Sequence, residues 1–236
     1  MQTYSWFRFK DVYSYEHDIL VEKQPDIILP KKRITKHIIP GHNGNIYIDN
    51  GAYEATTKSI ECSIHNIDRL DQIFSWLSGS GNLIFSNEPE KVYEAVILEQ
   101  IPLQKVGIFF NYKRFPLIFE VNPIKHSVNA QNDIKTINKS PYTFYGDGTI
   151  NALPIITISG NGDIVLDVNN STIALSDISG HITLNSQSMA AYKNSENQNY
   201  KMFGDFPVLL PQGNKNVLNW YGSISKIEIN PCWAWI

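Results

Sequence analysis

The sequence predicts a mainly β protein with a single short helix, and three patterns point to this fold class. Through most of the 236 residues, apolar and polar side chains alternate over short segments, which is the period of half-buried strands. Turns rich in glycine, proline and asparagine separate these segments into individual strands. Near residue 70 the period becomes that of a helix, and a lone helix in such a chain usually covers a sheet.

Residues 1–125 form the first predicted block, in which strands precede and follow the helix. Ile60, Cys62 and Ile64 alternate with polar residues, as expected for a strand with one buried face. Two apolar pieces flank a tight turn that contains Gly41 and Gly44, because glycine supplies the backbone freedom that such turns need. The last strand of the block is expected over residues 115–121.

The predicted helix places its apolar residues on one face, which is expected to meet the sheet. These residues fall at i, i+3, i+4 and i+7 and are Leu70, Ile73, Phe74 and Leu77. Asn66 or Asp68 is expected to cap the start of the helix. Gly79 or Gly81 is expected to end it.

Residues 126–152 differ from both neighbouring segments. They are rich in asparagine, lysine, serine and threonine, which indicates a linker or an extended surface segment. Residues 153–236 form the second predicted block, in which short apolar strands recur about every ten residues. The segment Gly160-Asn161-Gly162-Asp163 is expected to be a turn between two of them. This spacing favours an antiparallel sandwich.

The charge and composition argue against several classes of function. The formal net charge is −3 and the pI is about 6.1, so the chain lacks the basic field that nucleic-acid binding generally needs. The N-terminal residues lack the apolar core of a signal peptide, and no apolar run approaches the ~20 residues of a membrane span. Cys62 and Cys232 lie in apolar strand patterns and are expected to be buried thiols of a protein made in a cytosol.

The sequence contains no motif for catalysis, cofactor binding or metal binding. The nucleophile-elbow, zinc-protease, P-loop and dinucleotide-binding motifs are absent, and the six histidines lack the spacing of metal ligands. The cluster Gly79-Ser80-Gly81 follows a helix, whereas a phosphate cradle precedes one. We therefore expect no catalytic residue, cofactor or metal, and an enzyme is the least favoured class of protein.

Four aromatic residues near the end of the chain allow two interpretations. They are Trp220, Tyr221, Trp233 and Trp235. Exposed aromatic rings on a β-sandwich can stack on sugars, whereas buried rings fill the core or an interface. Trp233 and Trp235 share parity, so both would point to one face of a strand. The core or interface interpretation is favoured.

The order of several short motifs resembles the distal tail protein (Dit) family, which are tail components of siphovirus-type phages and prophages of Gram-positive bacteria. The motifs of the first block are Ile39-Pro40-Gly41-His42-Asn43-Gly44, Trp76-Leu77-Ser78-Gly79 and Tyr93-Glu94-Ala95. The second block carries Ile182-Thr183-Leu184-Asn185, Gly204-Asp205-Phe206-Pro207, and Pro231 with Trp233. The resemblance covers nearly the whole chain and depends on the order and spacing of these motifs.

The resemblance implies an N-terminal β-sandwich with one α-helix and a C-terminal galectin-like antiparallel β-sandwich. The N-terminal domain would form a hexameric ring that joins the tail tube protein to the tail-associated tip protein and the receptor-binding protein. Such a hub belongs to a virion tail assembled in the cytoplasm of the bacterial host. The candidate structural or interface residues are Gly41, His42, Gly44, Trp76, Trp233 and Trp235. His42 stands where the family pattern usually has arginine.

The competing class is a carbohydrate-binding module that attaches the tail to host cell-wall glycan. The second block spans about 85 residues, which is little more than a bare sandwich needs. We therefore expect neither an inserted arm nor an inserted lectin module, and no binding of simple sugars or cell-wall glycan.

Overall fold

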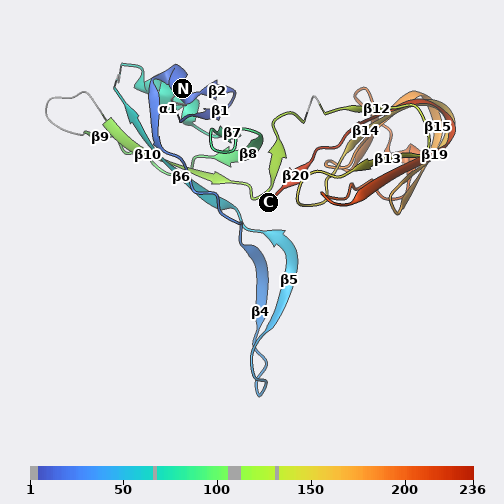
Figure 1. Cartoon of the computed structure of the whole chain (residues 1–236), viewed down its shortest axis with the longest axis horizontal. Helices are drawn as coiled ribbons and strands as arrows, with labels where there is room; N and C mark the ends of the chain where they lie inside the picture. Colours follow the sequence, from blue (N-terminus) through green and yellow to red (C-terminus); the bar gives the residue numbers. More distant parts are fainter. Residues whose placement is uncertain (1–4, 66–67, 106–112, 131–132) are drawn as a thin grey trace. The chain divides into compact units, whose positions relative to one another are not determined.

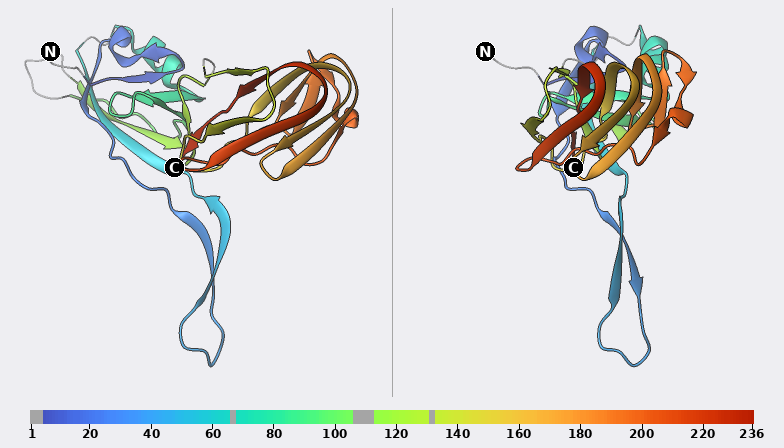
Figure 2. Two further views of the ribbon diagram at one scale, coloured as in Figure 1. Left: turned by 45° about the vertical axis from the view of Figure 1, so that its right-hand side comes forward. Right: turned by 90° about the vertical axis from the view of Figure 1, so that its right-hand side faces the viewer.

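The computed structural model describes residues 5–65, 68–105, 113–130 and 133–236. It divides into two compact units, residues 1–125 with Ile236 and residues 126–235 (Figures 1 and 2). The described part of the chain is mainly β and contains one α-helix, α1 (Leu70–Leu77), which confirms the predicted fold class. Two short 3₁₀ helices, Ser14–His17 and Asn199–Lys201, complete the helical content of the described residues.

The first unit is built on one antiparallel sheet. Its strand order is β2–β1–β7–β8–β10–β6–β3, and β9 adds to β10. The strands are β1 (Phe7–Phe9), β2 (Val12–Tyr13), β3 (Ile19–Lys23), β6 (Thr56–Ile64), β7 (Ser80–Phe85), β8 (Lys91–Val96), β9 (Gln104–Lys105) and β10 (Lys113–Val121). The longest pairing joins β6 to β10 along nine residue pairs, from Lys113 opposite Ile64 to Val121 opposite Thr56.

Alternate residues of these strands point inward and form the core of the first unit. Ile60, Cys62 and Ile64 are buried, as the alternation in the sequence predicts. Phe119 on β10 is fully buried, and its ring contacts the rings of Phe7, Phe9 and Phe85 with centroids 5.5 to 6.3 Å apart. All three contacts are edge-to-face, a geometry that aromatic pairs prefer in protein cores.

Helix α1 meets this core along a different face from the one predicted. Ile73 and Leu77 are buried, but Leu70 is only half-buried and Phe74 is 39% exposed. Trp76 takes the place expected for Phe74, so the packed face runs through residues 73, 76 and 77. The prediction for Phe74 is wrong because the i, i+3, i+4 pattern spans more of the helix than the sheet covers.

The ends of α1 agree in part with the predicted signals. The N-cap is Arg69, which makes no side-chain capping hydrogen bond, so Asp68 does not cap the helix. Asn66 lies outside the described residues. Ser78 follows the helix in an extended conformation, and Gly79 then adopts a left-handed φ of +77°. Gly79 therefore reverses the chain into β7, whereas Gly81 lies within β7.

A separate two-stranded sheet extends away from the rest of the first unit (Figures 1 and 2). It consists of β4 (Lys32–His37) and β5 (Ile46–Tyr53), which pair only with each other among the described strands. Every residue of β4 is exposed, and so are the first six residues of β5. We call this element, residues 32–53, the hairpin.

The second unit is dominated by three long antiparallel strands, β14 (Ile155–Val168), β15 (Ser171–Asn185) and β19 (Lys215–Asn230). The sheet order is β12–β19–β14–β15–β16–β17, with β13 on β19 and β18 on β15. The shorter strands of this sheet are β12 (Lys135–Ile137), β13 (Tyr142–Tyr145), β16 (Ala190–Lys193), β17 (Glu196–Asn197) and β18 (Met202–Phe203). Strand β20 (Ala234–Trp235) is not part of this sheet. Strand β11 (Lys125–Ser127) lies where one unit follows the other along the chain.

Residues 126–152, expected as a linker or an extended segment, belong to the second unit. They contain β12 and β13, which pair with opposite ends of β19. Thr136 lies opposite Glu228, and Thr143 lies opposite Val217. Backbone pairing therefore places part of this polar segment at the edge of the sheet.

The three long strands bend at glycines instead of ending there. The sequence predicts a turn at Gly160-Asn161-Gly162-Asp163, but β14 continues through it with a shift in register. A Cβ on Gly160 would lie 2.4 Å from the carbonyl oxygen of Ser223, and one on Gly222 would lie 2.5 Å from that of Asp163. Only glycine permits this close approach.

Each long strand consequently contributes to the same core on both sides of its bend. On β14, Ile156 and Ile158 precede the bend, and Ile164 and Leu166 follow it. All four belong to one buried cluster. The predicted pairs of short strands are thus single curled strands that fold over one core.

Candidate functional site

The tip of the hairpin carries three of the residues singled out in the sequence. Gly41, His42 and Gly44 lie between β4 and β5 and are all exposed. Gly41 and Gly44 have φ values of +81° and +92°, and the His42 amide donates to the Ile39 carbonyl at 3.1 Å. The glycines therefore form the tight turn that the sequence predicts.

Both faces of the hairpin carry exposed apolar side chains. Ile34 and Tyr47, which are 50% and 64% exposed, lie on one face, since Ile34 pairs with Asp49 and Tyr47 with Lys36. Ile46 and Ile48, which are 43% and 49% exposed, lie on the other. An ordinary surface hairpin covers one apolar face with the protein and leaves a polar face to water.

Ion pairs join the two strands of the hairpin near its base. Lys32 Nζ lies 2.7 Å from Asp49 Oδ2, and Lys31 Nζ lies 3.3 Å from Glu54 Oε2. The hydrogen bond between Lys32 and Asp49 raises the pKa of the lysine and lowers that of the carboxyl group. Both groups are open to solvent, so the pairs fix the register of the strands more than they stabilise the fold.

Trp76 anchors α1 to the sheet. Its indole Nε1 donates to the Phe9 carbonyl at 2.9 Å, and its ring stacks on Phe7 with centroids 5.7 Å apart. The centroid of the His17 ring lies 4.5 Å from that of the indole. Since these partners all lie within the first unit, Trp76 has a clear structural role there.

The terminal tryptophans do not form an open platform. Trp233 is 5% exposed and packs edge-on against Phe144, with ring centroids 6.4 Å apart. Trp235 is partly buried against the same core cluster. The geometry favours the core interpretation of these two residues over sugar stacking.

A buried charged cluster closes one part of the first unit. Glu88 accepts hydrogen bonds from Lys125 Nζ at 3.1 Å and from the Tyr93 hydroxyl. Lys58, which is 3% exposed, donates to the Asp26 carbonyl at 2.6 Å. Burial lowers the pKa of Lys58, whereas burial and the contact with Glu88 raise that of Tyr93. Each charge has a protein partner, as expected of a structural cluster.

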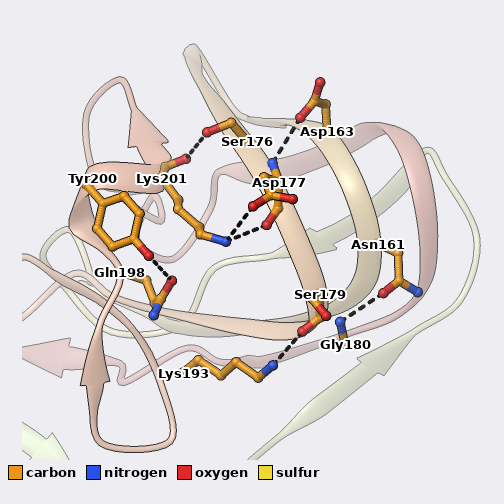
Figure 3. A network of polar contacts seen from close by, with 10 residues as sticks. All are labelled: Asn161, Asp163, Ser176, Asp177, Ser179, Gly180, Lys193, Gln198, Tyr200 and Lys201. Atoms are coloured by element: carbon orange, nitrogen blue, oxygen red, sulfur yellow. Dashed lines mark hydrogen bonds and ion pairs between the residues drawn. The ribbon is translucent and has the colours of Figure 1, made fainter.

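A second polar network lies at the bend of the long strands (Figure 3). The Asp177 amide donates to Asp163 Oδ1 at 3.0 Å, and the Gly180 amide donates to Asn161 Oδ1 at 2.9 Å. These side chains accept from backbone amides close to the point where the β14–β15 register shifts. They thereby satisfy amides near the irregular part of the ladder.

Two lysines supply the complementary donors in this network (Figure 3). Lys201 Nζ donates to the Asp177 carbonyl at 2.5 Å, and Lys193 Nζ donates to the Ser179 carbonyl at 2.7 Å. Side chains therefore pair with both backbone amides and backbone carbonyls at the bend. We interpret the network as one that stabilises the bent backbone.

The described residues contain neither a cluster of metal-ligating side chains nor an activated cysteine. Among them, no group of three or more histidine, cysteine, aspartate or glutamate side chains could hold a metal ion. Cys62 and Cys232 are free and buried, and burial raises the pKa of both thiols, so neither is an activated nucleophile. No helix in the described ranges is long and apolar enough to cross a bilayer.

The geometry thus defines a mainly β protein of two units with an exposed hairpin, and comparison with solved structures identifies a protein of similar fold. The chain is similar to the Dit protein (gp19.1) of phage SPP1, described as a paradigm of the hub adsorption apparatus of phages that infect Gram-positive bacteria. The two share 11% identity and superpose with a TM-score of 0.79 over 98% of this chain and 99% of the other. Neither a protein-family model nor a curated protein sequence matches the chain.

The chain has the fold of that Dit protein, so the resemblance read from the motifs is confirmed at the level of the fold. The match spans both units and is not confined to one common β domain. At 11% identity the match establishes the fold alone. The roles of individual residues must be argued from this chain's own geometry.

Proposed function

We propose that this protein is a structural hub of a phage tail, present in the virion or encoded by a prophage. The observation that carries the proposal is the match of the entire two-unit fold to a phage hub protein, with almost no residue of either chain left over. A hub works by assembly and needs no catalytic group. The satisfied polar clusters of both units fit such a role.

The hairpin supports a further part of this proposal, self-association through the first unit. An isolated two-stranded hairpin is at best marginally stable in water, and this one exposes isoleucine or tyrosine on both faces. Contact with neighbouring copies would bury both faces at once. A closed ring, for which we propose six copies, satisfies every such contact without leaving an open end.

The remaining partners follow from the position of a hub. We propose that the ring joins the tail tube protein to the tail-associated tip protein and the receptor-binding protein. The second unit is proposed to be a galectin-like domain on the outside of the ring, and the particle is assembled in the host cytoplasm.

The mass of the full-length chain in solution tests ring formation. Light scattering should give about six times the protomer mass of 26.9 kDa, and electron microscopy should show closed rings. The double variant Ile34→Asp with Tyr47→Asp places charges on one apolar face of the hairpin and should shift the mass to that of a monomer. The matched control is Tyr145→Asp, a 73% exposed aromatic residue of the second unit.

Two results would contradict the ring. One is a monomeric wild-type chain at every concentration up to the millimolar range. The other is an unchanged oligomer in the hairpin variant, which would place the contact elsewhere on the molecule.

A further inference from the structure

Strand register in the second unit brings four apolar residues into one row across the sheet. Val165 on β14 lies opposite Tyr221 on β19 and opposite Ala174 on β15. Ala174 in turn lies opposite Phe203 on β18. Residues directly opposite one another in antiparallel strands point to the same face. The order Phe203, Ala174, Val165 and Tyr221 therefore crosses four adjacent strands, and we call this row the aromatic strip.

The aromatic strip lies on the outer face of the sheet. Phe203 is 65% exposed and Tyr221 is 68% exposed. Ala174 is also exposed and Val165 is half-buried, whereas their strand neighbours Ile173 and Leu166 are fully buried. With about 4.8 Å between strands, three steps place the two aromatic residues roughly 14 Å apart.

A polar row runs beside the strip, two residues further along the strands. Asp167 lies opposite Thr172 on one side and opposite Asn219 on the other. The Thr172 hydroxyl donates to Asp167 Oδ1 at 2.7 Å, which orients the carboxylate. Asp167 has acceptor capacity beyond this bond, and Asn219 carries an amide that can both donate and accept.

We propose that the aromatic strip and its polar row bind a short carbohydrate chain. A sugar ring has an apolar face of C–H groups and an edge of hydroxyl groups, and this surface offers an aromatic or aliphatic row next to a hydrogen-bonding row. The separation of Phe203 and Tyr221 lets both rings contact one oligosaccharide of a few units.

Other occupants fit the surface less well. Two aromatic side chains bury at most about 500 Å², well short of the roughly 1,200 Å² or more of a stable protein interface. Asp167 is the one side chain of the two rows that carries a charge at neutral pH, and its negative charge disfavours nucleic acid. A small neutral glycan needs only a small contact area and is not repelled by the acidic side chain.

This site shares only Tyr221 with the four aromatic residues that the sequence singles out, and it departs from the expectation of no sugar binding. That expectation follows from the shortness of the second block, which leaves no room for an inserted module. The strip requires no insertion, because it lies on the sheet itself. It depends only on the second unit and is independent of ring formation.

Titration calorimetry on the full-length chain tests the proposal. The probes are a β-1,4-linked N-acetylglucosamine tetramer and maltotetraose. Saturable binding of either probe is expected, weakened about tenfold or more by Phe203→Ala and by Tyr221→Ala. Tyr145→Ala, which removes an equally exposed ring elsewhere in the unit, should bind like the wild type.

Stacking also predicts rescue, which separates a binding role from a structural one. Phe203→Tyr and Tyr221→Phe keep a flat ring and should retain affinity within about twofold. No binding of either probe overturns the proposal, as does equal loss in Tyr145→Ala or retention of binding in both alanine variants. Light scattering on the same samples measures the mass of the oligomer independently of glycan binding. Failure of the glycan site and failure of the ring are therefore distinguishable.

Discussion

At the scale of single residues, the position of each side chain around the axis of α1 decides whether that side chain packs against the sheet. Ile73, Trp76 and Leu77 meet the sheet, whereas Phe74 lies far enough around the helix to remain partly in water. The apolar period predicts a helix correctly. Of the four apolar residues in that period, however, the sheet fully covers only Ile73 and Leu77. Hydrophobicity alone could not tell Phe74 from Trp76, whose indole finds a backbone acceptor on β1.

Two charge substitutions on α1 should therefore have unequal effects. Ile73→Asp places a carboxylate in the core and should destabilise the first unit by about 3–5 kcal/mol. Phe74→Asp can turn its carboxylate to solvent and should cost less than half as much. Thermal melting of the full-length chain checks this, and equal losses for the two variants would show that the helix packs on another face.

The His17 side chain should make the stability of the first unit depend on pH. Its Nδ1 is buried without a hydrogen-bond partner among the described residues, and burial lowers the pKa of the imidazole below its usual 6.5. The folded state therefore binds the proton less well than the unfolded state does. This contribution to stability is fully present above pH 6.5 and is lost as the pH falls through the lowered pKa.

Melting temperatures measured between pH 7.5 and pH 5 test this contribution. The wild-type chain should lose stability toward pH 5, and His17→Gln should lose less over the same range. His181→Gln, at a histidine of the second unit, provides the control. The same pH dependence in all three chains would assign the effect to other groups.

At the scale of elements, the bends of the long strands explain a wrong prediction. Gly160 and Gly162 bracket a segment that reads as a turn, because turns and bends both need glycine. Whether the chain reverses or continues depends on the flanking strands, and here β14 stays paired with β15 and β19 on both sides of the bend. That choice rests on partners distant in sequence, which a local pattern does not contain.

A substitution at the bend should be costly for steric reasons. Gly222 has a φ of +114°, and a Cβ there would lie 2.5 Å from the Asp163 carbonyl oxygen. Gly222→Ala should therefore lower the free energy of unfolding by about 2–4 kcal/mol. Gly213, with a φ of +86° and open space around it, is the matched control. Gly213→Ala should cost only the backbone penalty of about 1 kcal/mol, and chemical denaturation separates the two outcomes.

At the scale of the whole molecule, the fold class and the likeness to a Dit fold could be predicted from the sequence, because they depend on period, composition and the order of motifs. The hairpin turn could be predicted from Gly41 and Gly44. The exposure of both faces of the hairpin could not, because it depends on whether other elements of the fold pack against β4 and β5. The aromatic strip was also beyond local patterns. The sequence singles out Tyr221, but the alignment of Tyr221 with Phe203 depends on register across four strands.

The continuity of β14, β15 and β19 through both halves of their sheet has a consequence for synthesis of the chain. Strand β19 pairs with β14 on both sides of the bend, about 50 residues after β14 begins its second half. On the ribosome, neither half of the second unit can close before β19 emerges, whereas the seven strands along the main path of the first unit's sheet all lie within residues 7–121. The order of synthesis therefore favours vectorial folding, in which the main strands of the first unit pair early and the second unit is completed in one late step.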